Sequence, residues 1–178
     1  MIRLFVGIGL PPEVADRLAA QGFGLPGARW IPARNLHLTL RFIGEVDEAE
    51  ASDLHEQLSL VNQPAFTLTL AGMGVFGDRH RAHTLWQGVD KSEELTRLAA
   101  RVELAAIKSG QKPEPRKFSP HITLARIKET APTRIQDFLA AAPPHRAEIV
   151  PVEEVLLFRS TLGRHGPEYD VLERYPLG

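Results

Sequence analysis

Two stretches of the chain, His37-Leu38-Thr39-Leu40 and His121-Ile122-Thr123-Leu124, share one pattern. Each alternates polar and apolar residues, as in a β-strand with one buried side and one side turned away from the core. On such a strand the histidine and the threonine point the same way. One His-x-Thr sequence arises easily by chance, but two copies, each followed by one helical and two strand-like segments, indicate a duplicated unit. Folded back on itself, such a unit can bring two imidazoles and two hydroxyls into one cleft.

The segments around the two motifs read as a mixture of strands and helices. We expect strands over residues 2–10, 36–46, 65–76, 84–89, 118–127, 145–150, 152–160 and 169–174. Helical periodicity predicts helices over 13–21, from Asp47 onward, over 93–108 and from Pro132 to about 142. Asp47 and Glu50 are spaced as in a helix-capping box. Strands and helices do not alternate strictly, which favours an α+β fold with antiparallel sheets over a doubly wound parallel sheet.

Length and composition are those of an ordinary globular domain. The chain has 178 residues, of which 43% are hydrophobic and 24% are charged, and its formal net charge is −1. Its pI of about 6.7 argues against a broad electrostatic grip on long nucleic acid, while a local basic site for a small anion remains open. The absence of cysteine excludes disulfides, thiolate catalysis and cysteine-ligated metal centres. With neither a signal peptide nor an apolar run that could span a bilayer, we expect a cytoplasmic protein without membrane contact.

The residue types of the two motifs suit acid–base chemistry on a phosphate. Histidine titrates near neutral pH, so one imidazole can accept a proton while a second donates one. In-line displacement at phosphorus needs both steps, and it also needs donors near the non-bridging oxygens. Thr39 and Thr123 offer hydroxyl groups on the same strand faces as the histidines.

Two arginines follow the motifs and could bind phosphate oxygens through their guanidinium groups. Arg41 comes four residues after His37, so a regular strand would point it to the same face. Arg126 comes five residues after His121, so a regular strand would point it away. Arg126 can therefore reach a phosphate only where the strand bends or ends near Ala125, and for Arg41 we favour a structural role.

The remaining histidines suggest no further site. His80 and His83 fall in an expected hairpin loop near Arg79 and Arg81, without the third ligand that a metal site needs. We expect His145 and His165 to lie in loops. The chain has no glycine-rich nucleotide motif and no His-Glu-x-x-His sequence, so we predict neither a cofactor nor a metal.

In this context the motifs are familiar, because the chain resembles the 2H phosphoesterase superfamily. Within it, the chain is similar to the RNA 2′,3′-cyclic phosphodiesterases, also called 2′-5′ RNA ligases. The similarity covers nearly the whole chain and is carried by residues 3–6, 30, 35–46, 118–126, 157–160 and 166–169. It implies one bilobal domain over residues 1–178, with pseudo-two-fold symmetry and two antiparallel sheets that face a central cleft, the helices lying outside.

The resemblance also implies an activity, the metal-independent hydrolysis of a terminal 2′,3′-cyclic phosphate to a 2′-phosphate. The catalytic pair maps onto His37 and His121. As a working hypothesis His37 donates a proton and His121 accepts one, and the reverse assignment stays open. The phosphate would be held by Thr39, Thr123 and Arg126.

Recognition of the terminal base is harder to read from the chain. Phe5 and Phe42 are the first candidates for stacking on a base, before Trp30, Phe118 and Tyr169.

The substrates would be RNA 3′ ends or small nucleotides with a 2′,3′-cyclic phosphate, and the protein would be a monomer. Three alternatives remain open, namely 2′-5′ RNA ligation at the same site, a binding module for RNA ends or nucleotides that lacks catalysis, and action on small cyclic nucleotides or ADP-ribose cyclic phosphates.

Overall fold

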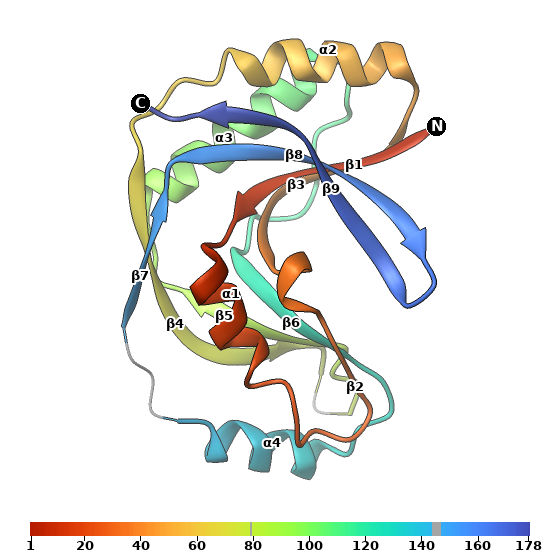
Figure 1. Cartoon of the computed structure of the whole chain (residues 1–178), viewed down its shortest axis with the longest axis vertical. Helices are drawn as coiled ribbons and strands as arrows, with labels where there is room; N and C mark the ends of the chain where they lie inside the picture. Colours follow the sequence, from red (N-terminus) through yellow and green to blue (C-terminus); the bar gives the residue numbers. More distant parts are fainter. Residues whose placement is uncertain (79, 144–146) are drawn as a thin grey trace.

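The computed structural model describes residues 1–78, 80–143 and 147–178 (Figure 1). Within these ranges the chain forms four α-helices, a short 3-10 helix and nine strands. The helices are α1 (Pro12–Ala19), η1 (Ala33–Asn35), α2 (Glu48–Ser59), α3 (Glu93–Lys108) and α4 (Pro132–Ala141). The strands are β1 (Ile2–Gly9), β2 (Ala28–Trp30), β3 (His37–Val46), β4 (Phe66–Phe76), β5 (Thr84–Val89), β6 (His121–Ile127), β7 (Glu148–Val152), β8 (Glu154–Gly163) and β9 (Gly166–Pro176).

The strands of the described residues form one sheet in the order β7-β4-β5-β6-β3-β1-β8-β9, with β2 on β6. All of its pairings are antiparallel, so the predicted α+β class with antiparallel strands is confirmed. The prediction of two separate sheets is wrong. The two motif strands, β3 and β6, pair with each other at Leu38 and Ile122 and so join the halves.

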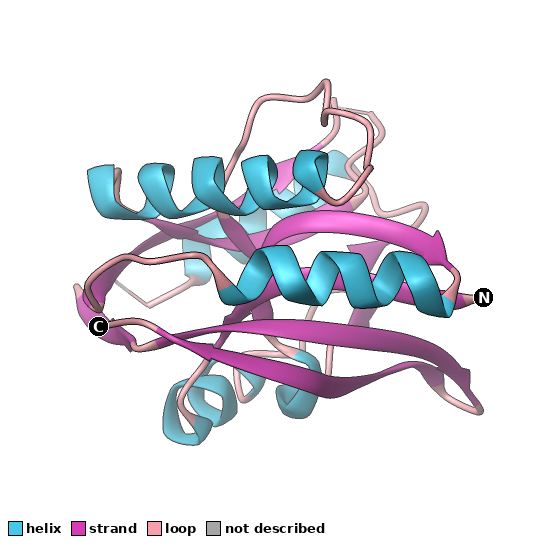
Figure 2. Cartoon of the chain, turned by 90° about the horizontal axis from the view of Figure 1, so that it is seen from above, coloured by secondary structure: helices cyan, strands magenta, loops and turns pink. Residues whose placement is uncertain are grey.

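The helices lie beside this curved sheet in two groups. Helices α2 and α3 pack side by side near β1, β8 and β9, whereas α1 and α4 lie toward β4, β6 and β2 (Figures 1 and 2). The capping box that Asp47 and Glu50 predict is present at the start of α2. The side chain of Ser92 caps α3 in a similar way. Gly110, with a φ of 104°, follows the end of α3 in a conformation that favours glycine.

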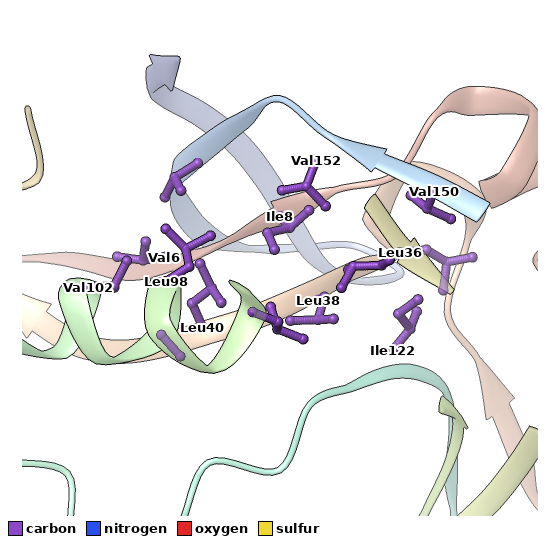
Figure 3. Close-up of a cluster of buried hydrophobic side chains, with 14 of the residues drawn as sticks. Val6, Ile8, Leu36, Leu38, Leu40, Leu98, Val102, Ile122, Val150 and Val152 are labelled. Carbon is purple, nitrogen blue, oxygen red and sulfur yellow. The ribbon is translucent and has the colours of Figure 1, made fainter. Parts of the chain in front are cut away.

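The hydrophobic core crosses the junction between β3 and β6. Figure 3 shows Leu38 close to Ile122, with Ile8 of β1 above Leu38 and with Val6 of β1 next to Leu98 of α3. These side chains are almost completely buried. The two halves therefore share one core, which fixes the motif strands rigidly relative to each other.

Most of the predicted elements are confirmed, and the differences have local causes. The second motif strand begins at His121 rather than at 118, after Pro120, which has no N–H for a ladder bond. The three-residue strand β2 was not expected because it lies beside a loop rich in Gly and Pro. Part of the strand expected over 145–150, with His145, lies outside the described residues. None of the helices in the described part of the chain is long and apolar enough to cross a membrane.

Candidate active site

The first motif strand, β3, carries a β-bulge directly after the His-x-Thr sequence. Against β1, Thr39 pairs with Gly7 and Arg41 pairs with Val6, so Leu40 is the extra residue. The bulge shifts the alternation of faces, and Leu40 and Arg41 are both buried.

As a result the prediction that Arg41 points to the His37 face is wrong. Its side chain, 8% exposed, donates to the Glu103 carboxylate and to the backbone carbonyls of Phe42 and Lys112. Phe42, 55% exposed, takes the place on the histidine side instead.

The second motif strand, β6, has a bulge at the matching position. Against β5, Thr123 pairs with Trp86 and Ala125 pairs with Leu85, so Leu124 is the extra residue. This bulge turns Arg126 to the face of His121 and Thr123, and the burial pattern along the strand agrees. The bend near Ala125 that Arg126 would need is therefore present.

The pairing of β3 with β6 brings the two motifs together. Because Leu38 lies opposite Ile122 in an antiparallel ladder, His37 falls opposite Thr123 and Thr39 opposite His121. The two motifs thus face each other head to tail in the middle of the sheet. A cavity of about 490 Å³ is lined by both Thr39 and His121 and continues toward Phe42, Phe76 and Phe118.

Each imidazole is oriented by the backbone two residues before it. Nδ1 of His37 lies 2.7 Å from the carbonyl oxygen of Asn35, and Nδ1 of His121 lies 2.7 Å from that of Ser119. A carbonyl oxygen only accepts, so Nδ1 carries the proton in both rings. The other nitrogen, Nε2, is then the atom that can take up or release a proton in each ring. In His37 it lies 2.9 Å from Oγ1 of Thr39.

Asn35 was not identified from the sequence as a site residue. It is 5% exposed, and its side-chain amide donates to the carbonyl oxygen of Pro167 at 2.8 Å. This bond fixes the segment that holds His37 to strand β9. In the sequence, only its position two residues before His37 pointed to Asn35.

Aromatic rings surround His37 and depress its pKa. The centroid of its imidazole lies 4.8 Å from that of Phe5, 5.6 Å from that of Phe158 and 5.4 Å from that of Tyr169. The pKa of His37 is lowered to about 4, chiefly by burial and to a smaller extent by the charges of His121 and Arg126, against the opposing effect of the Asn35 carbonyl.

His121 is less enclosed than His37. Its ring stands edge-on to Phe76 at a centroid distance of 4.7 Å. Its pKa is lowered, chiefly by burial, and the nearby charge of Arg126 lowers it further. Both imidazoles are therefore favoured in the neutral form in the free protein.

Arg126 is the cation shared by the whole cleft. Its charge acts on both histidines and on Tyr169, so it lies within electrostatic reach of all three. Its Nη1 donates to Oγ1 of Thr84 on β5 at 3.0 Å, which leaves the other guanidinium N–H groups available.

Of the aromatic residues considered for stacking on a base, some line the cavity and others lie away from it. Phe5 is 4% exposed and forms the floor beneath His37, stacked on Phe158 at 4.7 Å. Phe42 and Phe118 both line the cavity. Trp30 packs against Phe138 of α4 instead.

Comparisons with known proteins show which family the chain belongs to. The sequence model of the "LigT like Phosphoesterase" family matches residues 8–86 and 88–169. The RNA 2′,3′-cyclic phosphodiesterase of Aquifex aeolicus is 32% identical over 100% of this chain and 98% of its own length, and that of Escherichia coli is 34% identical over 98% and 96%. The crystal structure of E. coli LigT complexed with 3′-AMP has a TM-score of 0.79 at 30% identity, covering 99% of this chain and 98% of that one. The chain therefore belongs to the LigT-like phosphoesterase family.

Proposed function

We propose that this protein hydrolyses the 2′,3′-cyclic phosphate at the 3′ end of RNA to a 2′-phosphate, by acid–base catalysis of two histidines and without a metal ion. The observation that carries the proposal is the head-to-tail arrangement of His37 and His121, each with Nε2 as its reactive nitrogen. The names of the relatives, RNA 2′,3′-cyclic phosphodiesterases, support the same substrate.

Because of the two bulges, the two ends of the cleft carry different side chains. Beyond His37 and Thr123, strand β6 continues to the cation Arg126, and beyond His121 and Thr39, strand β3 continues to the aromatic Phe42. Phe42 offers an open ring, in a cavity that it shares with Phe76 and Phe118. The aromatic end suits a nucleobase, because every base has a face that can stack on a ring.

If the base lies at the Phe42 end, the orientation of the ribose relative to the two histidines follows. In ribose, C2′ is next to C1′, which carries the base, and C3′ is next to C4′, which leads to the 5′ phosphate. With the base at the Phe42 end, O3′ faces His37. The side of the phosphorus atom opposite O3′, from which water attacks, then faces His121. The arrangement supports His37 as the proton donor and His121 as the proton acceptor.

The proposed reaction is then a single in-line displacement. Nε2 of His121 takes a proton from water as the water oxygen bonds to phosphorus, and the P–O3′ bond breaks. Nε2 of His37 gives its proton to O3′, so the phosphate stays on O2′. The hydroxyl groups of Thr39 and Thr123 and the guanidinium of Arg126 stabilise the charge on the non-bridging oxygens.

His37 must gain a proton before it can act as the acid. Its pKa of about 4 in the free protein leaves it neutral at pH 7. The negative charge of a bound phosphate beside the ring favours the imidazolium form and raises this pKa. The bound substrate would thus favour the protonated form of His37 that its own hydrolysis requires.

We further propose that the chain is a duplicated unit with two lobes. Both motif strands carry a bulge at the fourth residue of the motif, Leu40 or Leu124, and both histidines use the same carbonyl contact. The family matches in two stretches, 8–86 and 88–169, and each contains one motif. The monomeric state and the cytoplasmic location stay predictions; light scattering after size-exclusion chromatography would measure the first.

The test is the product formed from a short RNA ending in a 2′,3′-cyclic phosphate, in the presence of EDTA. Conversion to a 2′-phosphate is expected, with a rate at least about a hundredfold lower for His37→Ala and for His121→Ala. A 3′-phosphate product would contradict the proposed direction of the ribose. A joined product in the presence of 5′-hydroxyl RNA would favour ligation, and tight binding without turnover would favour a binding module.

A further inference from the structure

We propose that Arg29 binds the phosphodiester on the 5′ side of the terminal nucleotide, so that the protein prefers an RNA strand to a mononucleotide. The inference rests on the proposed function for the orientation of the substrate. It adds a second phosphate site next to the one at Arg126. Only a substrate with a phosphate on the 5′ side of its terminal nucleotide can occupy this second site.

Arg29 and Arg126 are direct partners across the β2–β6 ladder. Directly opposed residues of an antiparallel pair point to the same face, with Cβ atoms about 4.5–5.5 Å apart. Arg29 therefore shares the face of His121, Thr123 and Arg126, although it comes from a distant part of the chain. It extends the cleft at the end away from Phe42.

Two like charges directly opposite each other destabilise a sheet. Among the described residues, neither Arg29 nor Arg126 forms an ion pair with a carboxylate that would offset this repulsion. Both side chains are exposed. Such a pair is stabilised by anions, and two guanidinium groups side by side can hold two neighbouring phosphates.

The Arg29 side chain is held in place by the β8–β9 hairpin. Its Nη2 donates to the carbonyl oxygen of His165 at 3.2 Å, in the turn between β8 and β9. A Cβ atom at the next residue, Gly166, would lie 3.1 Å from the same Nη2, and Gly166 has a φ of 123°. One N–H group is thus used for positioning, and the others remain for a ligand.

The position of Arg29 matches the path of an RNA strand. With the base at the Phe42 end and O3′ toward His37, the C5′ atom of the ribose points toward the end formed by Arg126 and Arg29. The next negative charge along the strand is the phosphodiester on O5′. In a nucleoside 2′,3′-cyclic phosphate without a 5′ phosphate this charge is missing, so Arg29 would have no ligand.

The experiment compares two substrates, the dinucleotide ApA with a 2′,3′-cyclic phosphate and adenosine 2′,3′-cyclic phosphate. Arg29→Ala should lower kcat/KM for the dinucleotide at least about tenfold, as expected for a hydrogen bond between charged groups, and leave the mononucleotide within about twofold. Arg29→Lys should restore part of the loss. The salt dependence of log kcat/KM for the dinucleotide should become shallower by about 0.7.

The matched control is Arg97→Ala, which removes another exposed arginine, on α3. Equal losses on both substrates would mean that Arg29 only supports the hairpin, and no loss on either would mean that it binds nothing; both results overturn the proposal.

If the wild type hydrolyses neither substrate, the proposed function is wrong. The role of Arg29 is then tested separately, by measuring nucleotide binding. Calorimetry should then show that adenosine 3′,5′-bisphosphate binds more tightly than 3′-AMP, and that Arg29→Ala removes the difference. Equal affinities of the wild type for the two nucleotides would overturn the proposal.

Discussion

The burial of a neutral His37 should make the stability of the protein depend on pH in a defined window. The folded pKa of His37 is about 4, below the value near 6.5 of an exposed histidine. As the pH falls through 6.5, the unfolded chain gains a proton that the folded protein does not accept. The stabilisation is therefore complete above pH 6.5, is lost as the pH falls toward 4, and is absent below it.

The size of the effect follows from the two pKa values. Between pH 7 and pH 5, proton uptake by the unfolded chain lowers the free energy of unfolding by about 2 kcal/mol through His37. The variant His37→Gln has no group that titrates there, so it lacks this component. The replacement also disturbs the contacts with Phe5 and Tyr169, but that cost is the same at every pH.

Urea unfolding of the wild type and of His37→Gln at pH 7 and at pH 5 provides the measurement. The wild type should lose about 2 kcal/mol more than the variant over this interval. His121→Gln is a useful second variant, because the lowered pKa of His121 acts in the same direction. Equal pH dependence in the wild type and in His37→Gln would refute the claim that His37 is held neutral by burial.

Three further predictions concern catalysis, the base and the core. His121→Ala should flatten one limb of the pH–rate profile as well as lower the rate, and an unchanged bell-shaped profile would contradict its acid–base role. Phe42→Ala should raise KM by roughly five- to 150-fold with little change in kcat, since stacking on one base contributes about 1–3 kcal/mol; a change in kcat alone would argue against stacking. Leu38→Ala, at the fully buried junction of β3 and β6, should lower the free energy of unfolding by about 2–5 kcal/mol in urea. Leu104→Ala, at a residue that is 50% exposed, is its control and should change stability by less than about 0.5 kcal/mol.

Local patterns in the chain predicted the elements well. Strand β5 and helix α3 begin and end where their alternation and periodicity predicted, and the Asp47 capping box is present. These features depend on neighbours within a few residues, so the information is local. For the same reason the motif strands were recognised from the alternation over residues 37–40 and 121–124, and the predicted family is confirmed by the family match.

The roles of the two arginines after the motifs were decided by tertiary structure. On regular strands Arg41 would face the cleft and Arg126 would not, and the structure has the opposite arrangement. A bulge arises from the pairing of a strand with its neighbour, and the neighbours of these strands, β1 and β5, are distant in sequence.

The sequence by itself determined that there are two His-Thr strands in an α+β chain with antiparallel strands, and which side chains share a face within each motif. The period of two along a strand suffices for this. Only the tertiary structure decided that the motif strands pair with each other, that Asn35 supports His37, and that Arg29 lies beside Arg126. These contacts join distant segments, and strand pairing and register depend on the packing of the whole sheet, which leaves no local pattern in the chain.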